Sequence, residues 1–312
     1  MSGRASSDTL APPVPIEPGA ERIVRRRHYG RWVAAALALA LASAFAFSLW
    51  RNPNVNRHVV LAYLFAGPTL SGVLVTVELT VLAMGIGVIG AVILALMRLS
   101  HNPVLVAVAL AYQWFFRGTP QLVQIIFWGF LGALYHNVII GIPGTRIVFF
   151  SAPTSTLVGA FVAALLGLGL NEAAYASEIV RSGILSVHRG QVEAALAVGM
   201  TPRRTMRRIV LPQSMRVIIP PMGNETISML KTTSLVSVIS GHDLLTNLQN
   251  IYSQTFQVIP LLIVACIWYL FLTTILSVVQ ARIERRYSRG VATGRQRTRL
   301  RPHGIRGTRT SQ

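Results

Sequence analysis

The sequence contains one lysine and one cysteine, and both scarcities exclude classes of protein. A nucleotide-binding P-loop needs Gly-Lys-Ser or Gly-Lys-Thr, because its lysine reaches the phosphates. The single lysine, Lys231, follows Leu230, so this chain cannot hold ATP in such a loop. The single cysteine, Cys266, lies in an apolar run, which excludes an intramolecular disulfide and gives thiol chemistry no support.

Catalytic and metal-binding patterns are missing as well. The chain has no HExxH, GxSxG or CxxC motif, and its seven histidines are scattered without partners at ligand spacing. We therefore expect a chain that is not an enzyme, with no metal site and no cofactor of its own. Charged residues are also scarce, at 12%, where soluble proteins have about a quarter.

Apolar residues, by contrast, make up 52% of the chain and gather in long runs. Runs of this length are typical of helices that cross a bilayer. The sequence therefore predicts an all-α, polytopic membrane helix bundle of about six transmembrane helices. The predicted spans cover residues 32–50, 72–97, 104–135, 149–170, 217–239 and 259–280.

Two of these runs contain glycine or proline at informative places. Arg117-Gly118-Thr119-Pro120 interrupts the third run and should kink or break its helix. A broken helix at membrane depth is tolerated only where it faces protein or a wet cavity. We expect either a surface-lying helix that leads into a span or a discontinuous span. Glycines 85, 87 and 90 in the second run would let another helix approach closely.

The formal net charge of +19 comes almost entirely from arginines in the two terminal tails and in residues 171–216. Cytoplasmic segments of membrane proteins carry such an excess, so we expect both termini and this loop to be cytoplasmic. Nucleic acid is not an expected partner, because no aromatic residue interleaves the arginines after Tyr287.

These features divide the chain into segments. Residues 1–31 form a disordered basic tail, and residues 32–71 form an extra N-terminal span with a periplasmic segment. Residues 72–281 form a core of five spans that includes the cytoplasmic loop 171–216, and residues 282–312 form a disordered arginine-rich tail. The first span could be a signal peptide with a small-residue site at Ala42-Ser43-Ala44, but its length favours an uncleaved anchor.

Polar side chains within or beside the spans are candidates for a solute path. Ionisable groups in a membrane segment usually face the bundle interior or an aqueous path. Several of them could instead form ion pairs between helices or line a subunit interface. Glu178, near the cytoplasmic mouth, is a poorer candidate. The candidate path residues are Glu78, Arg117, Glu225, Lys231, Thr232 and Ser234.

The loop itself has the pattern of a helix, a tight turn and a second helix. Gly199 is a typical C-terminal cap, and Thr201 followed by Pro202 can start the next helix. We expect Pro212 to end that second helix. One of its faces carries Arg203, Arg204, Arg207 and Arg208, which would suit membrane phosphates or an acidic protein.

At this loop the sequence resembles the membrane subunits of bacterial ABC importers. Their signature is EAA, three residues, Gly, nine residues, then I-x-LP, and it is matched here by Glu193, Ala194, Ala195, Gly199, Ile209, Leu211 and Pro212. The segments RGTPQLVQ, AYASEIVRSGI, GQVEAA with Gln191, LPQSMR and KTTSLVSVIS look like the branch that imports polar amino acids. The resemblance spans about residues 72–282.

The resemblance implies a type I permease-like core in the bacterial inner membrane. In that family the loop is the coupling element, which fits a groove on a separate ATP-binding subunit that carries the ATP. The implied partners are two ATP-binding subunits, a second permease subunit that is the same or similar, a periplasmic solute-binding protein and membrane lipid. Glu193, Ala194 and Gly199 would sit at the ATPase contact.

Two other classes of function remain open on the residues alone. A gradient-driven secondary transporter of small polar solutes also has buried charges, but it needs no EAA loop. A membrane scaffold could use its arginine-rich tails to bind lipid or partners. Co-purification of an ATPase would separate both from the importer.

Overall fold

The computed structural model describes residues 29–52, 55–141 and 148–287, and these fall into two units, residues 1–55 and 56–312. The described part of the first unit is helix α1 (Tyr29–Arg51), which agrees with the first predicted run. The expectation of disorder for residues 1–28 and 288–312 falls outside the described residues.

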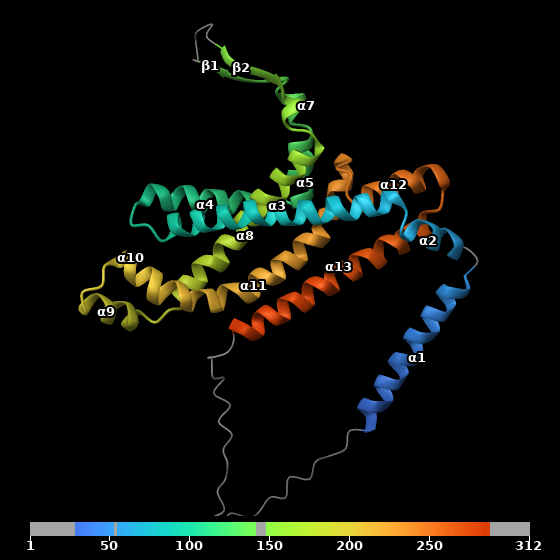
Figure 1. Ribbon diagram of the computed structural model, residues 1–312, viewed down its shortest axis with the longest axis horizontal. Helices are drawn as coiled ribbons and strands as arrows, with labels where there is room; N and C mark the ends of the chain where they lie inside the picture. Colours follow the sequence, from blue (N-terminus) through green and yellow to red (C-terminus); the bar gives the residue numbers. More distant parts are fainter. Residues whose placement is uncertain (1–28, 53–54, 142–147, 288–312) are drawn as a thin grey trace, which may run out of the picture. The chain divides into compact units, whose positions relative to one another are not determined.

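The second unit is a bundle of helices with one small β-hairpin (Figure 1). In chain order its first half contains α2 (Arg57–Leu64), α3 (Gly67–Arg98), α4 (Pro103–Gly118), α5 (Gln121–Gly129), α6 (Leu131–Leu134), β1 (Asn137–Gly141), β2 (Val148–Pro153) and α7 (Thr154–Leu157). The second half contains α8 (Ala160–Leu185), α9 (Arg189–Ala197), α10 (Pro202–Thr205), a π-helical stretch (Met206–Val210), α11 (Leu211–Thr232), a 3₁₀ stretch (Thr233–Ile239), α12 (Leu244–Thr255) and α13 (Val258–Tyr287).

Helices α3 and α8 form the centre of the bundle. Leu79 and Ala83 of α3 are buried against Leu168 of α8 and Ile125 of α5. Small residues let the two backbones come close, as is usual where helices pack inside a membrane. A Cβ on Gly87 would lie 2.5 Å from Cγ of Glu172 on α8, whereas a Cβ on Gly85 would meet nothing within 4 Å. The predicted close approach is therefore confirmed at Gly87 and wrong at Gly85.

We expect Gly87→Ala to destabilise the protein and Gly85→Ala to leave it as stable or slightly more so. The first adds a methyl group where α3 touches α8, and overpacking of this kind costs about 1–3 kcal/mol. The second only improves helix propensity, by about 1 kcal/mol at most. The melting temperatures of both variants, measured by thermal unfolding in detergent, check this difference in stability. Equal melting temperatures would contradict the close contact of the two helices.

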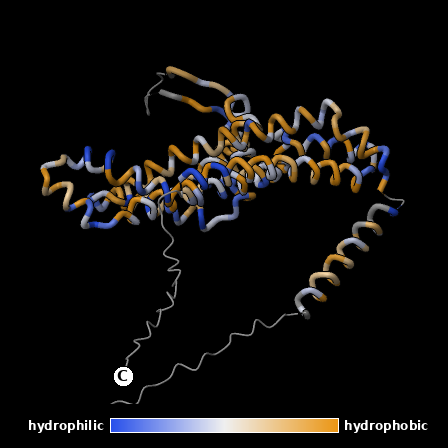
Figure 2. The backbone as a smooth tube through the Cα atoms, turned by 60° about the horizontal axis from the view of Figure 1, so that its bottom comes forward, coloured by the Kyte–Doolittle hydropathy of each residue, from blue (hydrophilic) through white to orange (hydrophobic). Residues whose placement is uncertain are grey.

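Three helices of the described residues are long and apolar enough to cross a membrane, namely α3, α8 and α13. Figure 2 shows that hydrophobic residues predominate along the helices, with hydrophilic residues interspersed among them. The other three predicted runs are also helical, in α1, in α4 with α5, and in α11, but these helices are shorter or more polar. The chain is thus a multi-pass membrane protein.

Some predicted element boundaries are wrong. The predicted fourth span, residues 149–170, starts in the antiparallel hairpin of β1 and β2, and its helix begins only at Ala160. That helix does not end at Leu170 but continues to Leu185, so residues 171–185 of the predicted loop belong to α8. Similarly, α13 extends to Tyr287 through part of the predicted C-terminal tail. Polar residues at positions 171–178 of α8 and 280–284 of α13 make side-chain hydrogen bonds within the bundle or along their own helix. These hydrogen bonds allow both helices to continue beyond the apolar runs.

Candidate functional site

The turn between α9 and α10 is built as its residues predict. Gly199 has a φ of +86°, a conformation that glycine adopts at little cost. Its N–H donates to the carbonyl of Leu196 at 2.9 Å, and the N–H of Met200 donates to Ala195 at 3.0 Å, which closes the end of α9. The hydroxyl of Thr201 then accepts from the N–H of Arg204 at 3.4 Å and caps α10.

The predicted coupling residues divide between the exterior and the interior of this loop. Glu193, Ala194 and Gly199 are exposed, while Ala195 is buried and Ile209 is half-buried. The side-chain amide of Gln213 donates to Oε1 of Gln191 at 2.5 Å and thereby ties α9 to the start of α11. Ala195 and Gln191 therefore hold the loop together, and Glu193 with the Gly199 turn lies on its outer surface.

The expectation that Pro212 ends the second helix is wrong. The chain runs from α10 through the π-helical stretch directly into α11, with Pro212 in the first turn of α11. A proline interrupts a continuous α-helix because it lacks an N–H and its ring clashes with the carbonyl four residues earlier. The wider π-turn before it changes that local geometry, so the helix passes the proline without stopping.

The helix break at residues 117–120 is confirmed, and amide side chains hold it. Nε2 of Gln124 donates to the carbonyl of Phe116 at 3.0 Å and to Oγ1 of Thr119 at 2.7 Å. Nδ2 of Asn171 donates to the same Phe116 carbonyl at 2.9 Å and to Oε1 of Gln124 at 3.1 Å. Carbonyls freed at the end of α4 are thus satisfied by side chains from α5 and α8, as a broken helix in a membrane requires.

A polar cavity of about 390 Å³ lies beside this break. Three predicted path residues, Arg117, Glu225 and Thr232, line it together, whereas Glu78, Lys231 and Ser234 do not. The guanidinium carbon of Arg117 stands 5.2 Å from the ring centre of Tyr175. The residues that line the polar cavity are Arg117, Gly118, Thr119, Pro120, Gln121, Asn171, Glu172, Tyr175, Glu225, Ser228, Met229 and Thr232.

Glu172 is the charged lining residue that sequence reasoning missed. Its side chain is only 6% exposed, and its Oε1 has no hydrogen-bond partner among the described residues. A second carboxyl group, that of the half-buried Glu225, lines the same cavity. A buried carboxylate without a partner is costly unless a cation or donor satisfies it. Glu178, by contrast, forms an ion pair with Arg181 at 2.5 Å and does not line the cavity.

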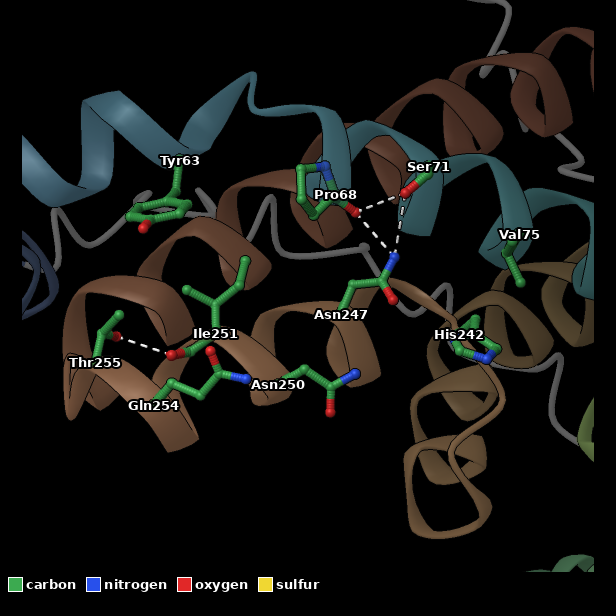
Figure 3. A pocket seen from close by; sticks show the side chains of 10 residues that line it. All are labelled: Tyr63, Pro68, Ser71, Val75, His242, Asn247, Asn250, Ile251, Gln254 and Thr255. Carbon is green, nitrogen blue, oxygen red and sulfur yellow. Dashed lines mark hydrogen bonds between the residues drawn. The ribbon is translucent and has the colours of Figure 1, made fainter.

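A larger cavity of about 650 Å³ lies between α2, the start of α3 and α12 (Figure 3). Nδ2 of Asn247 donates to the carbonyl of Pro68 at 2.9 Å and to Oγ of Ser71 at 3.3 Å, which joins α12 to α3. The amides of Asn250 and Gln254 also border it. Figure 1 places α12 at the far end of α3 from the α9–α10 turn. The bundle therefore has an amide-lined surface at one end and the arginine-rich loop at the other.

Comparison with known proteins agrees with this arrangement. Residues 83–289 match the family described as the inner membrane component of binding-protein-dependent transport systems. The arginine transport system permease protein ArgU of Corynebacterium glutamicum is 46% identical over 283 residues, covering 90% of this chain and 86% of the relative. The L-cystine transport system permease protein TcyB of Bacillus subtilis is 39% identical over 228 residues, covering 72% and 89%.

Solved structures show the same likeness. The crystal structure of an amino acid ABC transporter with histidines has a chain that is 36% identical, with a TM-score of 0.58, over 70% of this chain and 94% of that one. An inward-facing structure of the MetNI methionine ABC transporter shares the fold, with 18% identity and a TM-score of 0.52 over 70% and 95% of the chains. The chain belongs to the family of inner membrane components of binding-protein-dependent transport systems, the permease subunits of ABC importers.

Proposed function

We propose that this chain conducts amino acids with a cationic side chain through the polar cavity between α4, α5, α8 and α11. The observation that carries the proposal is that two carboxyl groups, those of Glu172 and Glu225, line the same cavity. An ammonium or guanidinium group would supply the partner that Oε1 of Glu172 lacks within the described chain. Arg117 lines the same cavity and would pair with the carboxylate of the solute.

The names of the relatives support an amino acid as the solute, and one of them names a cationic amino acid. ArgU is an arginine permease and TcyB an L-cystine permease, so both transport amino acids. An amino acid with a cationic side chain carries two positive groups and one negative group at neutral pH. Two carboxyl groups and one guanidinium in the cavity complement that distribution of charge.

We further propose how the chain assembles. The exposed turn at Gly199, with Glu193 beside it, is the surface that a separate ATP-binding subunit contacts. Two such subunits and a second permease subunit complete the transporter, and this chain has no ATPase site of its own. The loop and both termini lie in the cytoplasm. A solute-binding protein would deliver the amino acid at the opposite end, where α12 and the amide-lined cavity lie.

The first test is to isolate the tagged chain from native membranes in mild detergent and identify what accompanies it. We expect an ATP-binding subunit and a solute-binding protein in the eluate. After reconstitution with ATP inside liposomes, arginine should stimulate ATP hydrolysis more than glutamine, because only arginine has a cationic side chain in addition to its α-ammonium group. ATP hydrolysis is measured with solute-binding protein that is saturated with the amino acid, and a sample without binding protein is the control.

The outcomes separate the alternatives. Absence of any ATPase from the eluate, together with uptake driven by an ion gradient alone, would favour a secondary transporter. Absence of both ATPase and uptake would favour a scaffold. Equal stimulation by arginine and glutamine would retain the importer and contradict the cationic solute.

A further inference from the structure

A second groove, apart from the polar cavity, lies between α11 and α13. Its volume is about 590 Å³, and most of its lining is aliphatic. Ile219, Met222 and Ile227 of α11 face Leu276, Val279 and Ile283 of α13 across it. The solute cavity is lined by a different face of α11, which carries Glu225, Ser228 and Thr232. The groove is therefore on the side of α11 that the proposed solute path does not use.

The groove ends at basic and aromatic side chains. Arg286 and Tyr287 line it, and they also line an adjoining cavity of about 480 Å³. Arg216, from the beginning of α11, lines that second cavity. The apolar groove thus opens onto the adjoining cavity, which is lined by two guanidinium groups and lies at the end of the helices nearest the arginine-rich loop.

Little of α13 is covered by the other described helices. Only 11% of an 18-residue apolar stretch of α13 is buried within the structure, compared with 61% for α8. Because α13 is a membrane-spanning helix, a face left uncovered by the chain meets either lipid or another subunit. Arginine with tyrosine at the end of a spanning helix is the combination that sits at the headgroup level of a bilayer.

We infer that this groove binds one anionic glycerophospholipid. An acyl chain would lie along the aliphatic groove, and the phosphate would sit between Arg216 and Arg286. Basic pockets between spanning helices select lipids with a net negative charge. Glu284 lines neither cavity, and its Oε1 accepts a hydrogen bond from Gln280 at 2.8 Å, while Gln280 also donates to the carbonyl of Pro220 on α11.

The choice of a lipid over a second permease subunit follows from the charges. A protein surface that filled the groove would have to bring an acidic group to two arginines at the membrane boundary. An anionic phospholipid brings its own phosphate there, joined to a chain of the right polarity for the groove. The inference does not depend on the proposed solute.

Native mass spectrometry of the purified transporter with its ATPase tests the site. The complex is stripped of lipid and titrated with phosphatidylglycerol or phosphatidylcholine. We expect one tightly bound phosphatidylglycerol per permease chain and weaker binding of phosphatidylcholine. In the double variant R216Q/R286Q the preference should fall by roughly fivefold for each arginine removed, because each basic residue contributes about 1 kcal/mol at a membrane surface.

Arg285→Gln is the matched control, since Arg285 is the neighbouring residue but lines a cavity on another face of α13. It should keep the preference for phosphatidylglycerol. Thr226→Phe narrows the groove without touching either arginine, and it should weaken binding of both lipids alike. ATP hydrolysis by each variant shows that it has folded and assembled.

Two results would overturn the inference. In the first, R216Q/R286Q and R285Q would retain the same preference for phosphatidylglycerol. In the second, Val279→Cys in a Cys266→Ser background would form a disulfide between two permease chains in the assembled transporter. That disulfide would show that the second permease subunit covers the groove.

Discussion

Glu172→Gln should reduce the uptake of an amino acid with a cationic side chain by roughly thirtyfold or more. Removing the charge of one partner in a buried charge pair typically costs about 2 kcal/mol or more, which corresponds to this factor. Glutamine keeps the shape of the side chain, so the contact between Gly87 and residue 172 and the fold should persist. Uptake into proteoliposomes, with ATP hydrolysis measured in parallel, gives the result.

Glu178→Gln is the control for this prediction. Glu178 lies on the same helix but pairs with Arg181 and does not line the cavity. Glu178→Gln removes the same charge from α8, and uptake should change less than about fivefold, as expected for a partly exposed ion pair worth at most about 1 kcal/mol. If the two variants transported equally well, Glu172 would have no role in recognising the solute.

Gly199→Asp should leave the protein in the membrane and abolish most of its coupled ATP hydrolysis. A Cβ at residue 199 would meet no atom within 4 Å, so the substitution causes no clash inside the chain. Aspartate tolerates the left-handed conformation better than most residues, although it still costs about 1 kcal/mol there. Its carboxylate would stand on the exposed turn, at the proposed contact with the ATP-binding subunit. We expect a loss of roughly tenfold or more, or at least about 1.4 kcal/mol of contact energy.

Gly199→Asn separates the possible causes. Asparagine has the same size and also tolerates the left-handed conformation, but it carries no charge. A smaller loss with asparagine would assign the effect of aspartate mainly to its charge at the contact. For each variant, coupled ATP hydrolysis is compared with the amount of ATP-binding subunit that co-purifies with the permease. Full uptake by Gly199→Asp would show that the turn is not where the ATPase binds.

The loop could be predicted from sequence because its structure depends on local signals. Gly199 and the Thr201-Pro202 pair act on their immediate neighbours through backbone conformation and capping, and both act as expected. The break after Gly118 follows from Pro120 in the same way. Pro212 was misjudged because its effect depends on the π-helical stretch before it, for which no residue pattern gives a sign.

The cavity could be predicted only in part. Arg117 and Glu225 stand out as charges inside apolar runs, but Asn171 and Glu172 follow the end of the apolar run 149–170 and look like the start of a polar loop. Their burial arises from tertiary contacts, with Gln124 of α5 and with the close passage of α3 at Gly87. The sequence does not predict the strands β1 and β2, because short apolar stretches suit a strand as well as a helix.

Helical backbone continues from α10 through the π-helical stretch into α11, so part of the loop and one wall of the proposed solute cavity belong to the same continuous segment. Leu211 begins α11 and Glu225 lies fourteen residues further along the same helix, a distance of about 21 Å at about 1.5 Å per residue. Helical backbone joins the two, because the π-helical stretch continues past Pro212, but Pro220 and Pro221 lie inside α11 before Glu225 and remove backbone hydrogen bonds there. We expect a movement of the loop to reach Glu225 through this helical segment, with bending concentrated at Pro220 and Pro221.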